Sequence, residues 1–118
     1  METKKYQLPK EFATKWVEAL RSGKYSQTEA TLCRPDTCEY CCLGVAGAMT
    51  GLDNIDMSEL SDLSDFVDIF KTKYVFNDGI KQLADNQKLQ NVLTNLNDVD
   101  KLSFTEIADW IEANVEFI

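Results

Sequence analysis

Apolar side chains recur at helical spacing in three separate segments, and this pattern constrains the fold more than any other feature. The segments are residues 9–21, 86–97 and 103–115. In each one the apolar residues form a single stripe, as expected for a helix that buries one face. The third segment also opens with a capping box, Ser103-Phe104-Thr105-Glu106. Because each stripe must pack against another element, the sequence predicts a helix-rich core.

A short hairpin is predicted between the first two of these helices. Residues 28–33 and 38–43 read as strands on either side of the turn Arg34-Pro35-Asp36-Thr37, where proline is favoured at the second position. Such a hairpin is marginal alone and must pack on helices. We therefore expect an α+β fold, a single helix-rich domain over residues 1–118 with four or five helices and a small antiparallel hairpin. The length of 118 residues suits one core.

Three further segments have less regular patterns. Residues 44–49 are small and apolar, and they predict a short buried helix or a tightly packed crossing that ends at Gly51. Residues 73–76 are expected to form an edge strand. Asn77-Asp78-Gly79 is a turn signal.

Between residues 57 and 71 an apolar residue recurs at every third position, and so does an acidic residue. We predict a helix over residues 58–70. One charge every three residues of a helix places charges about 4.5 Å apart along the axis. That spacing is close to the roughly 3.4 Å between phosphates of one DNA strand. The helix is either a solvated face or an acidic, DNA-mimicking surface that binds a basic protein. The residues of that partner-binding alternative are Asp56, Glu59, Asp62, Asp65 and Asp68.

Charge and composition narrow the function classes. The net charge of −8 disfavours direct binding of nucleic acid, which requires a basic surface. The chain has no histidine, which excludes Ser-His and Cys-His nucleophilic pairs and every imidazole metal site. No apolar run approaches the roughly 18 residues of a membrane span, and the N-terminal residues are charged. We expect a cytoplasmic protein that is not an enzyme and does not bind a membrane.

Four cysteines follow the pattern C-x4-C-x2-C-C, at Cys33, Cys38, Cys41 and Cys42. Adjacent cysteines on a strand point to opposite faces, so all four are poorly placed to share one metal ion. We predict no metal and no cofactor, and we interpret the thiols as small buried hydrophobic groups. The alternative is a small thiol enzyme that uses Cys41 or Cys42, with no histidine to act as its base.

A polar cluster follows the first helix, and a second one ends the next predicted helix. Arg21, Tyr25 and Gln27 form the first cluster, and Asn97 and Asp98 form the second. Together they predict a small pocket in which Arg21 pairs with an anion and Tyr25 stacks on a base. The alternative is structural: Arg21 binds the last carbonyls of its helix, Tyr25 and Gln27 brace the hairpin, and Asn97-Asp98 is a plain turn.

Several motifs resemble those of a family of small bacteriophage proteins. The resemblance covers both ends and the hairpin but not residues 53–85. It rests on Trp16-x-x-Ala19-Leu20-Arg21-Ser22-Gly23-x-Tyr25-x-Gln27, Tyr40-Cys41-Cys42-Leu43-Gly44-Val45, Leu96-Asn97-Asp98, Ser103-Phe104 and Ile107-Ala108-Asp109.

This resemblance implies a phage-encoded accessory or anti-defence protein that binds its target stoichiometrically. Small acidic phage proteins often block a defence complex, mimic DNA or sequester a nucleotide signal. We therefore expect the partner to be a small anionic ligand or a host protein. We also expect that the protein can form a homodimer.

Overall fold

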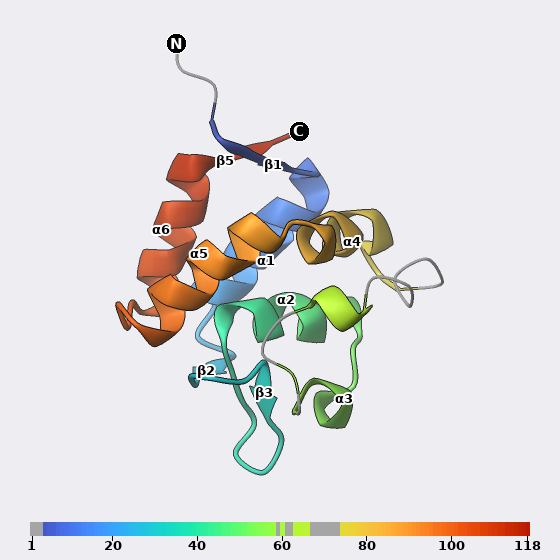
Figure 1. Cartoon of the computed structure of the whole chain (residues 1–118), viewed down its shortest axis with the longest axis vertical. Coiled ribbons are helices and arrows are strands. Elements are labelled where there is room, and N and C mark those ends of the chain that lie inside the picture. The colour runs from blue at the N-terminus through green and yellow to red at the C-terminus, as the bar shows by residue number, and fades with distance from the viewer. Residues whose placement is uncertain (1–3, 59, 61–62, 67–73) are drawn as a thin grey trace.

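The computed structural model describes residues 4–58, 60, 63–66 and 74–118 and shows an α+β, helix-rich fold, as predicted (Figure 1). The terminal strands lie at one end of the molecule and the hairpin lies at the other (Figure 1). The elements in order are β1 (Tyr6–Leu8), α1 (Lys10–Arg21), β2 (Ser26–Gln27), β3 (Cys33–Arg34), β4 (Glu39–Tyr40), α2 (Cys42–Thr50), α3 (Asn54–Ser58), the 3-10 helix η1 (Ser64–Phe66), α4 (Asn77–Asp85), α5 (Gln87–Asp98), α6 (Phe104–Asn114) and β5 (Val115–Phe117).

Three helices form where the apolar stripes predict them. α1 buries its stripe against α6, α2 and α4. α5 begins at the N-cap Asn86, whose side chain accepts a hydrogen bond from the backbone N–H of Leu89. The predicted capping box starts α6, with Ser103 and Glu106 each bonded to the other's backbone N–H. The local signals were sufficient here because cap and stripe agree.

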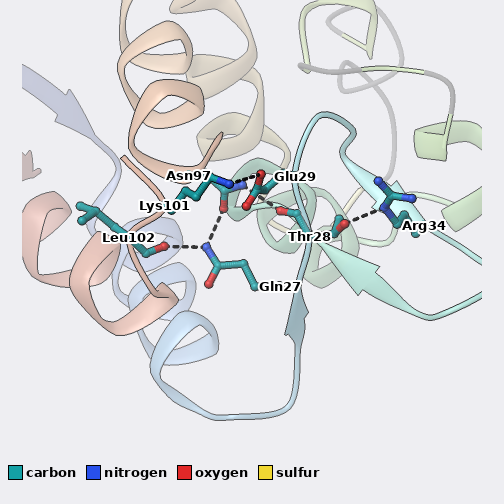
Figure 2. Close-up of a pocket in the computed structure, with 7 residues that line it drawn as sticks. All are labelled: Gln27, Thr28, Glu29, Arg34, Asn97, Lys101 and Leu102. Atoms are coloured by element: carbon teal, nitrogen blue, oxygen red, sulfur yellow. Dashed lines mark hydrogen bonds and ion pairs between the residues drawn. The ribbon is translucent and has the colours of Figure 1, made fainter. Parts of the chain in front are cut away.

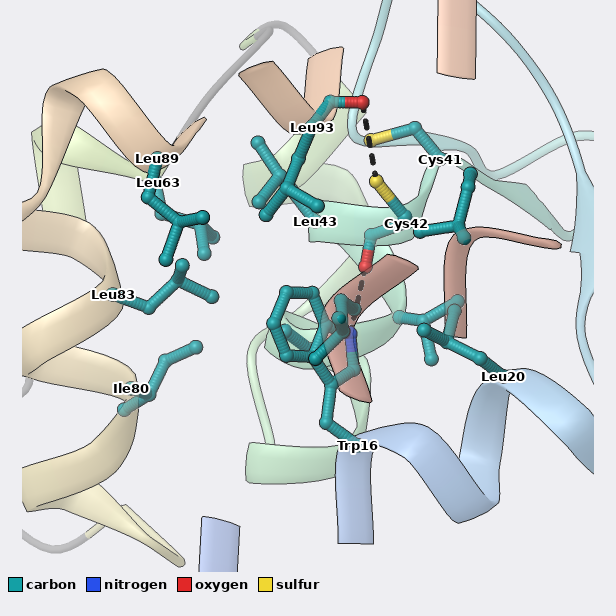
Figure 3. Packing of buried hydrophobic residues seen from close by; sticks show 14 of the residues in the cluster. Trp16, Leu20, Cys41, Cys42, Leu43, Leu63, Ile80, Leu83, Leu89 and Leu93 are labelled. Carbon is teal, nitrogen blue, oxygen red and sulfur yellow. Dashed lines mark hydrogen bonds between the residues drawn. The ribbon is translucent and has the colours of Figure 1, made fainter. Parts of the chain in front are cut away.

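The central helix α2 is buried on nearly all sides, as its uniformly small and apolar sequence indicates. Gly44 lies against the backbone of Leu32, and a Cβ at this position would come 1.8 Å from the Leu32 carbonyl oxygen. The indole N–H of Trp16 donates to the carbonyl of Cys42 at 3.0 Å (Figure 3). Gly51 ends α2 with a φ of 106°. α2 therefore joins α1 and the hairpin in one core.

The hairpin is present but shorter than predicted. β3 and β4 pair antiparallel, and the turn between them closes with a hydrogen bond from Thr37 N to Arg34 O of 3.3 Å. The predicted strand over 28–33 is wrong for residues 28–32, because the chain bends there and Ala30 takes a left-handed φ of 70°. The predicted strand over 38–43 ends at Tyr40, because Cys41 is the N-cap of α2.

Two strand pairings link segments that are distant in sequence, and neither was predicted. β2 pairs parallel with β4, which completes a sheet of order β2-β4-β3. β1 pairs parallel with β5 and joins the two ends of the described chain. These strands have two or three residues, too few for a period-two pattern to show.

The predicted continuous helix over residues 58–70 is wrong. α3 ends at Ser58, Leu60 is not helical, and residues 64–66 form the separate 3-10 helix η1. A stripe with a period of three drifts around an α-helix, so one straight helix would not bury it. Met57, Leu63 and Phe66 are each buried without a continuous helix, and residues 59, 61, 62 and 67–70 of the prediction lie outside the described residues. The carboxamide of Gln90 accepts the backbone N–H of Leu63 at 2.7 Å.

The edge strand and turn predicted around residue 76 are also wrong. Residues 74–76 lead directly into α4, and Asn77-Asp78-Gly79 is its first turn; Lys73 lies outside the described residues. Gly79 serves close packing here, because a Cβ at this position would come 2.3 Å from the Cβ of Phe12. In the described part of the chain, no helix has the length and apolar content needed to cross a bilayer.

Candidate functional site

A polar hollow of about 420 Å³ lies between the hairpin sheet and the α5–α6 connection (Figure 2). β2 and the bend after it form one wall, and the end of α5 with the following loop forms the other. Arg34 lies at one end of the hollow and Leu102 at the other, and the Lys101 side chain extends from the side of Leu102 toward Glu29 (Figure 2). Its lining residues are Gln27, Thr28, Glu29, Arg34, Asn97, Lys101 and Leu102.

Two side-chain amides hold the walls together. Gln27 Nε2 donates to Asn97 Oδ1 at 2.9 Å and to the carbonyl of Leu102 at 2.7 Å. Asn97, which is only 1% exposed, donates through Nδ2 to the carbonyl of Thr28 at 2.8 Å and to Asp98 Oδ1 at 2.7 Å. Each amide therefore uses both of its N–H donors inside the protein. Gln27 Oε1 has no partner in the described residues and points away from Asn97 (Figure 2).

Asp98 orders the bend opposite α5. Its Oδ2 accepts the backbone N–H of Ala30 at 3.1 Å, while its Oδ1 accepts from Asn97. Ala30 has a left-handed φ of 70°, and Lys101 on the other wall has one of 56°. Such conformations are uncommon for residues other than glycine and persist where surrounding contacts impose them. The rim of the hollow is thus built from two constrained backbone positions.

The charged side chains of the hollow are one carboxylate and two cations. Arg34 donates through Nε to Thr28 Oγ1 at 2.7 Å, and its other guanidinium nitrogens have no partner in the described chain. Lys101 pairs with Glu29 at a long 3.8 Å, and all these side chains are partly or fully accessible to water. Asp98 lies behind the lining with both oxygens engaged. Arg34 therefore offers a guanidinium edge to an incoming anion.

Three of the five predicted ligand-binding residues come together at this hollow. Gln27 and Asn97 line it, and Asp98 supports it. The Asn97-Asp98 pair therefore does more than close a turn. The sequence missed Glu29, Arg34 and Lys101, because Arg34 was interpreted only as a turn residue and no local signal singled out the other two.

Arg21 lies elsewhere. Its guanidinium pairs with Asp109 at 2.7 Å and with Glu112, both on α6. These hydrogen bonds, first that of Asp109 and then that of Glu112, raise the pKa of Arg21. The alternative, in which Arg21 binds the last carbonyls of α1, is also not observed, because its hydrogen bonds go to Asp109 and Glu112. The hydroxyl of Ser22 instead donates to the carbonyl of Ala19 at 2.7 Å. Arg21 connects α1 to α6.

Tyr25 lies outside the polar hollow as well. Its ring meets the ring of Tyr40 edge to face, with centroids 5.3 Å apart and planes at 84°. It lines a different hollow between α1 and β2. Tyr25 thus braces the hairpin, as the structural interpretation of this residue predicts, while Gln27 ties the hairpin to α5.

The thiols are mostly buried. Cys41 caps α2, with its sulfur accepting the backbone N–H of Gly44 at 3.3 Å, and burial raises the pKa of Cys41 to about 12. Burial also raises the pKa of Cys42 well above its ordinary value. Cys33 is buried, whereas Cys38 is exposed on the hairpin turn. No group of three or more metal-ligating side chains is present among the described residues.

The predicted acidic surface lacks the helix that was to carry it. Asp56 and Asp65 are exposed, on α3 and η1 respectively. Glu59, Asp62 and Asp68 lie outside the described residues. A single helical row of five carboxylates is therefore not formed, and the geometric match to a DNA strand that rested on that row is lost.

Comparison with known proteins places the chain in a family. A family model described as "Domain of unknown function (DUF8296)" matches residues 8–78, which include Gln27 and Arg34. No curated protein and no solved structure matches the chain. The match spans more than half of the sequence, so the chain belongs to this family.

Proposed function

We propose that this member of the DUF8296 family acts by stoichiometric binding of a small anionic, nucleotide-like ligand in the polar hollow. The observation that carries the proposal is the set of polar groups in the hollow that the protein leaves unpaired or only weakly paired. The outer guanidinium nitrogens of Arg34 and Gln27 Oε1 have no partner in the described residues, and Lys101 has only a long 3.8 Å contact with Glu29 (Figure 2). Guanidinium groups bind phosphate and carboxylate with two parallel hydrogen bonds.

The hydrogen-bonding inventory narrows the class of ligand. Because the amide donors of Gln27 and Asn97 are already used, the side-chain amides of the walls offer the ligand only an acceptor, Gln27 Oε1. Gln27 Oε1 suits an N–H or amino group, as on a nucleobase edge, while Arg34 and Lys101 suit a phosphate. The volume of about 420 Å³ falls within the range of roughly 300–1,000 Å³ usual for small-molecule sites.

Binding without turnover fits the chemistry of these residues. A nucleophile needs an activating base or a lowered pKa, and the chain has no histidine. The thiols proposed as alternative nucleophiles have raised pKa values: that of Cys41 is about 12, and that of Cys42 lies well above its ordinary value. The only hydroxyl of the lining, on Thr28, accepts a hydrogen bond from Arg34, and it donates to no base in the described residues. We therefore propose a sequestering protein and not an enzyme.

The biological role that we propose is that of a phage-encoded protein that removes a nucleotide signal of the host in the host cytoplasm. Its support is the resemblance of the Trp16-to-Gln27 and Tyr40-to-Val45 motifs to small phage proteins. Gln27 belongs to the first motif and contacts Asn97 of the Leu-Asn-Asp motif. Two of the motifs that carry the resemblance thus meet at the hollow.

The experiment is a thermal-shift screen with AMP, GMP, cyclic dinucleotides and inorganic phosphate. A ligand of this site should raise the melting temperature of the wild type and have little effect on the double variant Arg34→Gln/Lys101→Gln. Lys88→Gln is the matched control, since Lys88 is exposed on α5 and forms no ion pair in the described chain. Equal shifts in wild type and double variant would contradict the proposed site.

A plating assay tests the role in infection. A bacterial strain with a nucleotide-signalled defence should become more sensitive to phage when it expresses the wild-type chain. The double variant should lose this effect, and Lys88→Gln should retain it. An increase in phage sensitivity with the double variant equal to that with the wild type would contradict sequestration in the hollow and would direct attention to a protein partner.

A further inference from the structure

A second hollow, of about 300 Å³, lies beside α1, between the segment that follows this helix, the end of α2 and Phe76. It shares no lining residue with the polar hollow, so it is a separate site. Its chemistry is also different, because apolar side chains form much of its wall and lysines stand among them. The residues that line it are Lys15, Glu18, Ala19, Ser22, Lys24, Tyr25, Met49 and Phe76.

The aromatic walls are fixed before any ligand arrives. Tyr25 is held edge to face by Tyr40, whose hydroxyl donates to Asn54 Oδ1 at 3.1 Å. Phe76 meets Phe12 at a centroid distance of 6.5 Å, and its backbone is left-handed with a φ of 58°. That conformation is rare for a bulky residue. A ligand ring would therefore enter without the entropic cost of ordering these side chains.

The rim carries an excess positive charge although the protein is acidic overall. Lys15 pairs with Glu18 at 3.5 Å, which leaves Lys24 as the cation whose ammonium group has no partner in the described residues. The Ser22 hydroxyl is engaged, since it donates to the carbonyl of Ala19 and accepts the backbone N–H of Lys24 at 3.2 Å. The walls thus offer aromatic and other apolar side chains and one cation without a partner in the described residues, with few groups free to hydrogen-bond the edge of a nucleobase.

We infer that this hollow binds a compact aromatic anion, a planar ring that carries one carboxylate or sulfonate. The ring packs on the apolar wall of Tyr25, Met49 and Phe76, and the anionic group lies toward Lys24. A nucleotide suits the site less well, because its base edge would find few partners here. This ligand class complements both the charge and the apolar character of the hollow.

An NMR titration of the 15N-labelled chain with naphthalene-2-sulfonate tests the inference. We expect saturable shifts at residues 19, 22–25, 49 and 76. Lys24→Gln should weaken binding about two- to fivefold, the scale of one exposed ion pair. Tyr25→Leu should weaken it about two- to tenfold, through the lost ring contact. Lys88→Gln is the charge-matched control and should bind as the wild type does.

Two controls test the role of charge and the independence of this hollow from the polar hollow. Neutral naphthalene-2-methanol should bind more weakly than the sulfonate, and Arg34→Gln/Lys101→Gln should leave sulfonate binding unchanged. Failure of the nucleotide screen would therefore not affect this result. The inference is overturned if shifts do not saturate, if they cluster away from residues 19, 22–25, 49 and 76, or if Lys24→Gln binds as tightly as the wild type.

Discussion

The carboxamide of Gln27 donates a hydrogen bond of 2.9 Å to Asn97, 70 residues further along the chain. Asn97 in turn donates to the carbonyl of Thr28, next to Gln27. These two hydrogen bonds fix β2 against the end of α5, and the polar hollow exists because the two walls are held at this separation.

Replacing Asn97 with Ala should therefore be strongly destabilising. The substitution leaves the Thr28 carbonyl and one Gln27 N–H without their partners in a buried setting, at a cost of about 2–4 kcal/mol. Urea denaturation of both proteins measures the difference in the free energy of unfolding. Asn95→Ala, at an exposed position of the same helix, should change it by less than about 0.5 kcal/mol. A small change in the free energy of unfolding for Asn97→Ala would contradict the structural role of these hydrogen bonds.

Gly44→Ala should prevent normal packing of α2. Alanine usually favours a helix over glycine by about 1 kcal/mol. Here its methyl group would come 1.8 Å from the carbonyl oxygen of Leu32, so the backbone of one segment must move. We expect a loss of at least about 2 kcal/mol in the free energy of unfolding, or a failure to fold. Ala48→Gly, on the partly exposed side of α2, should cost only about 1 kcal/mol. Stabilisation by Gly44→Ala would contradict the observed contact.

The buried thiols predict the alkaline behaviour of the protein. Because folding raises the pKa of Cys41 from 9.0 to about 12, the folded state holds its proton where the unfolded state has lost it. This contribution to stability is complete below pH 9 and disappears as the pH rises toward 12. Unfolding curves between these limits should show stability falling with pH. Cys41→Ala should flatten that slope, and an unchanged slope would contradict the assignment.

Thiol labelling gives a second check on the cysteines. With iodoacetamide at neutral pH, the exposed Cys38 should react, while Cys33, Cys41 and Cys42 should stay unmodified in the folded protein. Mass spectrometry of the digested protein identifies the labelled positions. Fast labelling of Cys41 or Cys42 would instead favour the thiol-enzyme alternative.

Arg21→Gln should separate structure from binding. Arg21 pairs with Asp109 and Glu112 of α6 and does not line the polar hollow. The variant should have a lower melting temperature than the wild type, and the difference should shrink as salt is added, because exposed ion pairs are screened. Its response to a ligand of the hollow should match that of the wild type. Loss of ligand binding in Arg21→Gln would instead support the pocket predicted from the sequence, in which Arg21 binds the anion.

Sequence reasoning succeeded where the determinants were local. α1, α5 and α6 each combine an apolar stripe with a recognisable start or end, and the turn at Pro35 closes the hairpin as expected. It failed where a distant partner decides the conformation. Gly79 was interpreted as a turn residue, yet its lack of a side chain serves the close approach of Phe12. The short strands depend on pairing with β4 and β5, which leaves no pattern within each segment.

The same contrast between local determinants and distant partners explains which residues of the candidate site could be predicted. Gln27, Asn97 and Asp98 were predicted to act together, and the structure places them in contact. Arg21 was misplaced because its carboxylate partners lie 88 and 91 residues away, and nothing around Arg21 indicates them. Arg34 and Lys101 supply the cations of the hollow, from a strand end and a loop where sequence alone shows no role.

Native mass spectrometry of the chain, mixed with the nucleotide panel at equal concentrations, tests the central claim most directly. The account predicts one added ligand mass per chain for the wild type and for Lys88→Gln, and little or none for Arg34→Gln/Lys101→Gln. The loss of guanidinium contacts should reduce affinity about tenfold or more. A bare chain mass with every ligand, or equal retention by the double variant, would contradict stoichiometric binding in the polar hollow.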